Sequence, residues 1–281
     1  MAEAATPRRA QEYSIDLGAT LELIDFLGGS GVSAILLLGS AGEFVHFAID
    51  DRLHMVNFAV KRSRLPVFVN VSHSTLDGAV ELAREGLTAG VAGFTLMPPH
   101  YYRYTEDTIY SFFLAFAREL GDAVPIYLSG VQTSTAAQLL KTDLFAGVIS
   151  SALEEIRGLA GESAHVLAGW EPVYRDARAL GATGVVSGIA CAVPELMVAF
   201  ERALTTGQPD LAARLEARIQ EFLDGADQLP FPIGIKEAGR RRKLKMGAFA
   251  VPPGEQEGRK LEEFREWLDG WLPRVLSECR G

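Results

Sequence analysis

The sequence predicts an α/β fold in which eight parallel strands alternate with helices, a (β/α)8 barrel, followed by a helical extension at the C-terminal end. Short apolar runs alternate with amphipathic stretches of about 10–15 residues over the first two thirds of the chain. The runs recur on average about every 25 residues, and no block of strands stands alone, which indicates a parallel sheet. The 281 residues also suit a barrel, which typically takes about 250.

Composition defines the class of protein. Hydrophobic residues make up 48% of the chain, enough for a large core, and this excludes wholesale disorder. The net charge of −9 argues against a surface for nucleic acid or anionic membranes. No uncharged apolar stretch of about 18 residues is present, and no apolar run follows Arg8 and Arg9 as in a signal peptide. Two cysteines form no disulfide framework, so we expect a soluble, cytoplasmic protein.

Seven apolar runs fit strands that are buried on both faces. They span residues 34–38, 67–71, 93–97, 125–128, 145–149, 165–168 and 184–186. Helices are predicted between them at 51–61, 76–89, 106–120, 153–160 and 172–180. Asp50 and Thr75 suit the N-caps of the first two helices, and Gly90 and Gly121 suit the ends of the second and third.

The two ends of the chain depart from this pattern. Residues 1–13 are polar and contain no apolar run, so the first strand is predicted to be degenerate, short or missing. Either the start is clipped or residues 1–9 supply an irregular strand. After residue 186 the pattern is wholly helical. We therefore assign 1–192 to the barrel and 193–281 to a barrel-closing helix and a C-terminal helical extension.

The active site of such a barrel lies in the loops at the carboxyl ends of its strands. Gly39-Ser40-Ala41-Gly42-Glu43 follows the first visible run, and its glycines allow backbone N–H groups to point at a carboxylate or phosphate. Tyr127 lies at the end of an apolar strand, which aims its hydroxyl into the mouth of the barrel.

Several segments resemble, in order and spacing, the blocks of the dihydrodipicolinate synthase / N-acetylneuraminate lyase family. The segments at 39–43, 98–105, 126–127, 167–171 and 179–188 resemble its GTTGE, PPYYxxPT, YNxPxRT, LSGDD and ALGAxGxISG blocks. The similarity runs from about residue 6 to 253. It implies a TIM barrel, lyase or aldolase activity on a 2-keto acid such as pyruvate, no cofactor, and a homo-dimer or homo-tetramer.

The resemblance also implies roles for single residues. In the family a lysine at the end of strand six forms a Schiff base with the keto acid, and a tyrosine on strand five relays the proton. By resemblance Tyr127 is the acid/base, Ser40 belongs to the relay, and Tyr101 matches a tyrosine that a neighbouring subunit often shares. The residues expected to bind substrate are Gly39, Ala41, Glu43, Gln132, Ser150 and Gly188. Among these, Ala41 is expected to donate its backbone N–H to the carboxylate of the keto acid.

Two departures change the chemistry. The strand-six segment reads Ala-Gly-Val-Ile-Ser-Ser-Ala at 146–152, so either Ile149 or Ser150 stands at the lysine position, and neither forms an imine. The Gly-Ile-Lys-Glu-Ala at 234–238 lies after the eighth strand, and Lys236 is interpreted as a helix-surface or interface lysine. Gln132 replaces an arginine that binds a second carboxylate, which disfavours the dihydrodipicolinate synthase reaction itself.

Three hypotheses follow. The first is a carbon–carbon or carbon–oxygen lyase that acts on a 2-keto acid without a Schiff base. The second is a non-catalytic keto-acid-binding protein or structural partner of a lysine-bearing paralogue. The third is a metal-assisted lyase that uses His73, His100 and Glu43. The favoured interpretation of these residues is different: the two histidines lie on separate loops without an ion, and Glu43 ties its own loop through backbone N–H groups. The basic run at 240–245 is interpreted as a solvated or subunit-contacting helix end.

Overall fold

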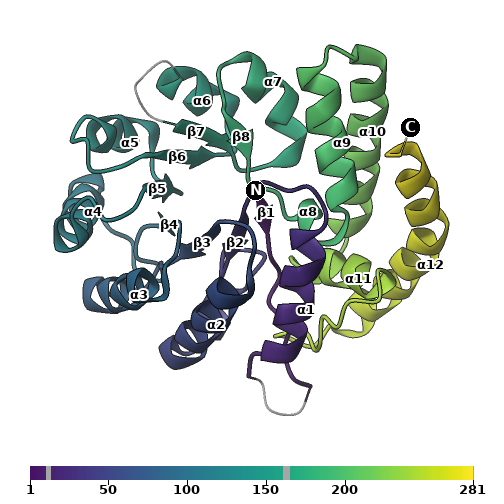
Figure 1. Ribbon diagram of the computed structural model, residues 1–281, viewed down its shortest axis with the longest axis horizontal. Helices are drawn as coiled ribbons and strands as arrows, with labels where there is room; N and C mark the ends of the chain where they lie inside the picture. The colour runs from purple at the N-terminus through teal and green to yellow at the C-terminus, as the bar shows by residue number, and fades with distance from the viewer. Residues whose placement is uncertain (11–13, 161–164, 281) are drawn as a thin grey trace. The chain divides into compact units, whose positions relative to one another are not determined.

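The computed structural model describes residues 1–10, 14–160 and 165–280. Its strands form one eight-stranded sheet in the order β1 to β8, with parallel pairing (Figure 1). The strands are β1 (Ala2–Glu3), β2 (Ile35–Leu37), β3 (Val67–Asn70), β4 (Gly93–Leu96), β5 (Ile126–Ser129), β6 (Gly147–Ser150), β7 (His165–Ala168) and β8 (Gly184–Val185). The predicted fold class, a TIM-barrel-like α/β fold, is confirmed.

Helices alternate with these strands and continue after β8. They are α1 (Leu17–Gly28), α2 (Ile49–Arg62), α3 (Leu76–Ala89), α4 (Glu106–Leu120), α5 (Thr133–Leu140), α6 (Leu153–Leu159), α7 (Tyr174–Ala179), α8 (Ile189–Ala192), α9 (Pro194–Thr205), α10 (Pro209–Ala226), α11 (Ile233–Arg241) and α12 (Glu255–Glu278), with 3₁₀ turns η1 (Phe44–His46) and η2 (Glu171–Val173). Within the described residues, no helix has the length and apolar character needed to cross a membrane.

Three of the four helix ends predicted from capping signals are confirmed. The Thr75 side chain accepts a hydrogen bond from the Gly78 N–H and caps α3, while Gly90 ends that helix with φ 89° in the left-handed region. Gly121 follows α4 with a positive φ of 59°. The prediction for Asp50 was wrong, because α2 begins at Ile49 and Asp50 lies in the first turn. There its charge still complements the positive end of the helix.

The first strand is short, as predicted. β1 pairs Ala2 with Ile35 and Glu3 with Leu36, and Ala2 also forms a parallel bridge with Ser187. Two residues are too few to show an alternating or continuous apolar pattern, which is why the sequence did not reveal the strand. Residues 11–13 of the predicted degenerate segment lie outside the described residues.

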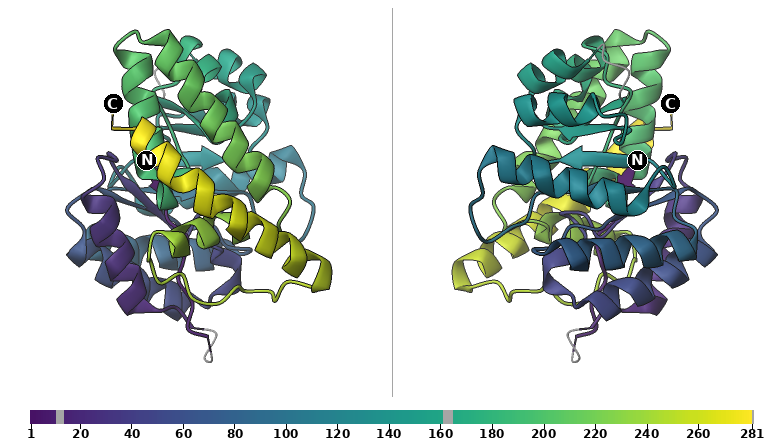
Figure 2. Two further views of the ribbon diagram at one scale, coloured as in Figure 1. Left: turned by 90° about the vertical axis from the view of Figure 1, so that its right-hand side faces the viewer. Right: turned by 90° about the vertical axis from the view of Figure 1, so that its left-hand side faces the viewer.

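The chain divides into two compact units, and the predicted boundary after residue 192 stays a prediction. The first unit comprises 1–47, 62–65 and 187–281. In it the long helix α12 packs on α9, α10 and α11 (Figure 2). On α12 the ring of Trp267 stacks on the rings of Phe264 and Trp271, at centroid distances of 5.5 and 5.1 Å. The second unit comprises 48–61 and 66–186, with strands β3 to β8.

Candidate functional site

The loop after β2 is tightly folded and mostly buried. Ser40 is exposed, whereas Ala41, Gly42 and Glu43 are buried. Glu43 has φ 54° and Leu38 has φ 58°, the left-handed region that non-glycine residues rarely adopt. A Cβ atom on Gly42 would lie 2.7 Å from the Leu38 Cα, so the turn needs glycine there. Such local strain is concentrated at functional sites, which agrees with the predicted role of this loop.

The backbone N–H of Ala41 binds a carboxylate, and that carboxylate belongs to Glu3. The distance from the Ala41 nitrogen to Glu3 Oε1 is 3.1 Å. A Cβ atom on Gly39 would lie 2.1 Å from the same oxygen, so the missing side chain of Gly39 leaves the space that this carboxylate fills. Sequence reasoning missed Glu3. The available signal was a single acidic residue between Ala2 and Ala4.

Glu43 and Lys236 form a buried ion pair. The Lys236 side chain is 0% exposed, and the Lys236 Nζ contacts Glu43 Oε2. Burial lowers the pKa of Lys236, and the Glu43 carboxylate acts in the opposite direction. The prediction of a helix-surface or interface lysine was wrong. Residues 233–239 of α11 are all buried, so Lys236 does not lie on a solvated face of the helix.

The pair also changes the interpretation of Glu43. The Glu43 carboxylate ties the loop to α11 through Lys236. The sequence predicted that this carboxylate would bind backbone N–H groups within its own loop. His46 Nδ1 lies 3.7 Å from the other carboxylate oxygen. Gly188, which precedes α8, approaches the same loop, since a Cβ atom on Gly188 would lie 4.0 Å from that of Ala41. The first unit therefore brings together Gly39, Ala41, Glu43 and Gly188 of the predicted site.

Cys191 is buried beside this group. The Ala5 N–H donates a hydrogen bond to its Sγ atom at 3.2 Å. Burial raises the pKa of the Cys191 thiol to about 12; the Glu3 charge raises it further and the Lys236 charge opposes this. A thiol of this kind is protonated at neutral pH and is a poor nucleophile.

Tyr127 of β5 lies in the second unit against neutral neighbours. It pairs with Thr95 of β4 and Gly147 of β6, and its ring meets the Phe68 ring edge-on at 5.9 Å. A Cβ atom on Gly147 would lie 3.0 Å from the Tyr127 ring, so the glycine leaves room for it. Burial raises the pKa of Tyr127 and keeps its hydroxyl protonated at neutral pH.

The register of β6 places the two residues considered for the lysine position on opposite faces of the strand. Ile149 lies two residues beyond Gly147, the partner of Tyr127, and side chains of a strand alternate between faces. Ile149 therefore shares the face of Tyr127. Ser150 points to the other face, where its hydroxyl donates to the Glu155 carboxylate and its oxygen accepts from the Ala152 N–H at 3.2 Å. That hydroxyl is used in the turn before α6.

The remaining predicted site residues of the second unit stand on exposed loops. Tyr101 is 89% exposed with φ 87°, and its ring packs edge-on against Tyr102 at 5.0 Å. Gln132 is exposed directly before α5. The structure does not gather these two residues around Tyr127 through any contact among those described.

The two histidines of the metal hypothesis bind neighbouring hydroxyls. His73 Nδ1 lies 3.0 Å from Thr75 Oγ1, and His100 Nε2 lies 3.1 Å from Ser74 Oγ. Over residues 1–10, 14–160 and 165–280, no three His, Cys, Asp or Glu side chains gather in a geometry suited to a metal ion. The metal-assisted hypothesis gains no support from this part of the chain.

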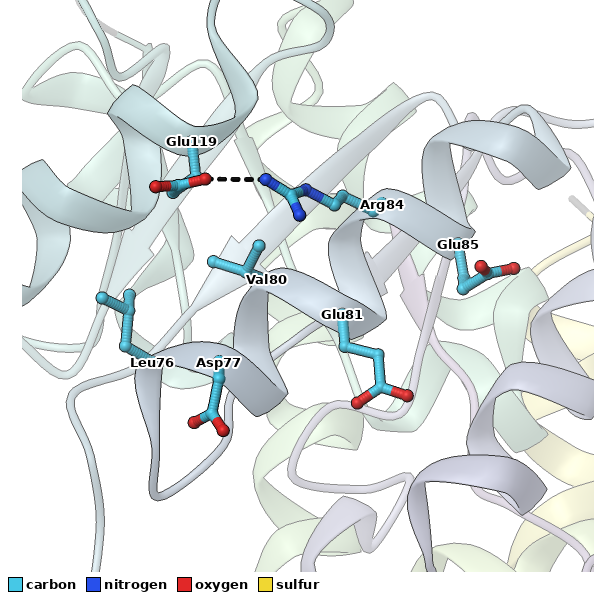
Figure 3. Close-up of a pocket in the computed structure, with 7 residues that line it drawn as sticks. All are labelled: Leu76, Asp77, Val80, Glu81, Arg84, Glu85 and Glu119. Atoms are coloured by element: carbon cyan, nitrogen blue, oxygen red, sulfur yellow. Dashed lines mark hydrogen bonds and ion pairs between the residues drawn. The ribbon is translucent and has the colours of Figure 1, made fainter.

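A surface groove of about 450 Å³ lies along α3 and the end of α4 (Figure 3). In this groove the guanidinium of Arg84 forms an ion pair with the carboxylate of Glu119, with an N–O distance of 2.7 Å. Its lining residues are Leu76, Asp77, Val80, Glu81, Arg84, Glu85 and Glu119. The groove contains none of the predicted site residues.

Comparison with known proteins identifies the family to which the chain is similar. The model of the dihydrodipicolinate synthetase family matches residues 4–269. A 4-hydroxy-tetrahydrodipicolinate synthase of Oceanobacillus iheyensis is 24% identical over 267 residues, which cover 90% of each protein. The crystal structure of dihydrodipicolinate synthase from Aquifex aeolicus superimposes with a TM-score of 0.87 at 24% identity, covering 96% of this chain and 97% of that one. YagE, a prophage protein of E. coli solved in complex with pyruvate, gives 0.86 at 20% identity, with coverage of 96% and 97%.

Proposed function

Because the chain belongs to the dihydrodipicolinate synthetase family, we propose that it is a carbon–carbon or carbon–oxygen lyase that acts on a pyruvate-like 2-keto acid without an imine on β6. The observation that carries the proposal is the pairing on one face of β5 and β6. Tyr127 is present there with a protonated hydroxyl, and Ile149 stands where an imine-forming amine would be needed.

Tyr127 can support this chemistry as a neutral group. When the C3–C4 bond of a 4-hydroxy-2-keto acid breaks, the 4-hydroxyl loses its proton to a base, an aldehyde leaves, and the electron pair of the bond moves to the ketone oxygen as an enolate, which a proton at C3 converts to pyruvate. In a carbon–oxygen cleavage the same kind of enolate forms by loss of the C3 proton and then expels the oxygen leaving group. A phenol that donates a hydrogen bond to that oxygen stabilises the charge and can pass a proton to the product. The ketone itself then receives the electron pair that an imine would otherwise receive.

Trapping with borohydride tests the absence of the imine. The native protein and an Ile149→Lys variant are incubated with pyruvate, reduced, and examined by intact-mass measurement. We expect no adduct on the native protein and an adduct on Ile149→Lys, which places an amine on the face of Tyr127. A pyruvate adduct on the native protein, at Lys236 or elsewhere, would overturn the proposal.

Turnover separates the proposal from its alternatives. We expect the native protein to release pyruvate from one or more 4-hydroxy-2-keto acids. The same lack of an amine also favours a second candidate, a keto-acid-binding or structural partner of a lysine-bearing paralogue. Stabilisation by pyruvate without any turnover would support that candidate, since a ligand at a hundredfold excess over Kd stabilises by about 2.7 kcal/mol.

We further propose a homo-dimer or homo-tetramer that binds no nucleic acid. The basic run at 240–245 is engaged within the protein. Arg241 pairs with Asp269 at 3.1 Å, Arg242 with Glu195 at 2.6 Å and Lys245 with Glu22 at 2.7 Å. These pairs support a structural role for the run. Light scattering after size exclusion measures the oligomer, and the cytoplasmic location stays a prediction.

A further inference from the structure

We propose that Glu3 determines substrate specificity, because its carboxylate holds the Ala41 N–H that a keto-acid carboxylate would bind. The inference deepens the proposed function and rests on it for the assignment of a keto acid to this loop. It assigns to β1, the shortest element of the sheet, a direct part in substrate selection.

The backbone around Glu3 fixes the position of its carboxylate at the Ala41 N–H. Glu3 is fixed on both sides, since its backbone N–H donates to the Ser187 oxygen at 2.9 Å and the Ala4 N–H donates to the Leu36 oxygen at 2.9 Å. From this position the side chain reaches the Ala41 nitrogen. The absence of a side chain on Gly39 makes room for the carboxylate, which a Cβ atom there would strike.

The loop itself is also held in place. The Thr6 hydroxyl donates to the Gly42 oxygen at 2.7 Å, and the Glu43–Lys236 pair anchors the other end. These contacts hold the Ala41 N–H and the Glu3 carboxylate in position against each other. The Ala41 N–H is neutral, so it offers no positive charge that would stabilise two carboxylates at once. A second carboxylate at this N–H must either displace Glu3 or lie against it, and both are unfavourable.

The consequence is a preference that is unusual for a site of this kind. A small keto acid with a free carboxylate competes with Glu3 for the Ala41 N–H. A keto compound whose neighbouring group is neutral, such as the amide of the same acid, meets no like charge and can donate a hydrogen bond to Glu3. The native protein is therefore expected to bind the neutral compound at least as tightly as the anion.

Binding of pyruvate and of its neutral amide, pyruvamide, tests this preference by calorimetry. We compare the native protein with Glu3→Ala, which vacates the space, and with Glu3→Gln, which keeps the shape and removes the charge. Glu22→Gln is the matched control, because Glu22 is an exposed carboxylate of the same unit whose partner is Lys245. Thermal melting establishes that each variant is folded, and Glu3→Gln serves if Glu3→Ala does not fold.

We expect Glu3→Ala to bind pyruvate about tenfold more tightly than the native protein does, which corresponds to about 1.4 kcal/mol, with little change for pyruvamide. Glu3→Gln should shift the same ratio in the same direction, and Glu22→Gln should leave it unchanged. An unchanged ratio in folded Glu3 variants would overturn the inference, as would a native protein that prefers pyruvate tenfold, or no binding of either probe to any variant. These are binding ratios, so they stand or fall separately from turnover and trapping, which test the proposed function.

Discussion

The loop after β2 and the strand pair β5–β6 use opposite electrostatics. The loop is surrounded by fixed charges, namely the carboxylates of Glu3 and Glu43 and the ammonium of Lys236. The strand pair presents Tyr127 and Ile149, which are neutral at physiological pH. The charges of the loop are already engaged with protein partners. In the function proposed above, these charges hold the loop and select the substrate, whereas proton transfer is assigned to the neutral hydroxyl of Tyr127 on β5.

Replacement of the Tyr127 hydroxyl gives the largest expected effect. Tyr127→Phe should lower kcat at least about 100-fold with a small change in KM, because a positioned acid or base contributes about 10²–10⁴-fold. Steady-state kinetics with the substrate found by the turnover screen measures this change. Tyr102→Phe is the control, since the Tyr102 ring is exposed.

The pH profile sharpens this prediction. Burial raises the pKa of Tyr127 above its usual value of 10.0, so the phenol stays protonated through the neutral range. Any loss of kcat that depends on Tyr127 should therefore have its midpoint above pH 10 and vanish from the profile of Tyr127→Phe. A full rate in Tyr127→Phe would remove the hydroxyl from the mechanism.

Disruption of the charged region should act on stability. Lys236→Met leaves the Glu43 carboxylate buried without its ammonium partner, and we expect the free energy of unfolding to fall by about 3–5 kcal/mol. Urea denaturation measures the loss. The double variant Lys236→Met/Glu43→Gln should recover much of it, because it also removes the carboxylate that the single variant leaves buried without a partner. A stable single variant that has lost activity would instead indicate a chemical role for Lys236.

The smallest effect concerns Ser150. Ser150→Ala removes the oxygen that accepts from the Ala152 N–H before α6, so we expect a loss of about 1 kcal/mol in unfolding free energy and an unchanged KM. The exposed neighbour Ser151 provides the control as Ser151→Ala. A raised KM in Ser150→Ala alone would restore the substrate contact that the sequence predicted for this residue.

Local patterns predicted the fold well and the site only in part. The apolar runs located β2 to β8 because buried parallel strands are continuous apolar segments, and Gly90 ended α3 because its conformation is left-handed. The loop at 39–43 was found because glycines and strand order placed it at a carboxyl end. Lys236 was misplaced, since spacing along α11 does not reveal that every side of residues 233–239 is covered.

By itself the sequence determined the alternation of strands and helices, the position of Tyr127 on β5 and the absence of a lysine from β6, because these depend on residue type and local periodicity. Only the tertiary structure decided that Ile149 shares the face of Tyr127, that Lys236 is buried against Glu43, and that Glu3 holds the Ala41 N–H. Lys236 and Glu43 are 193 positions apart in the chain, and Ala41 and Glu3 are 38 positions apart. Contacts at such separations are fixed by strand register and packing, on which local sequence patterns carry no information.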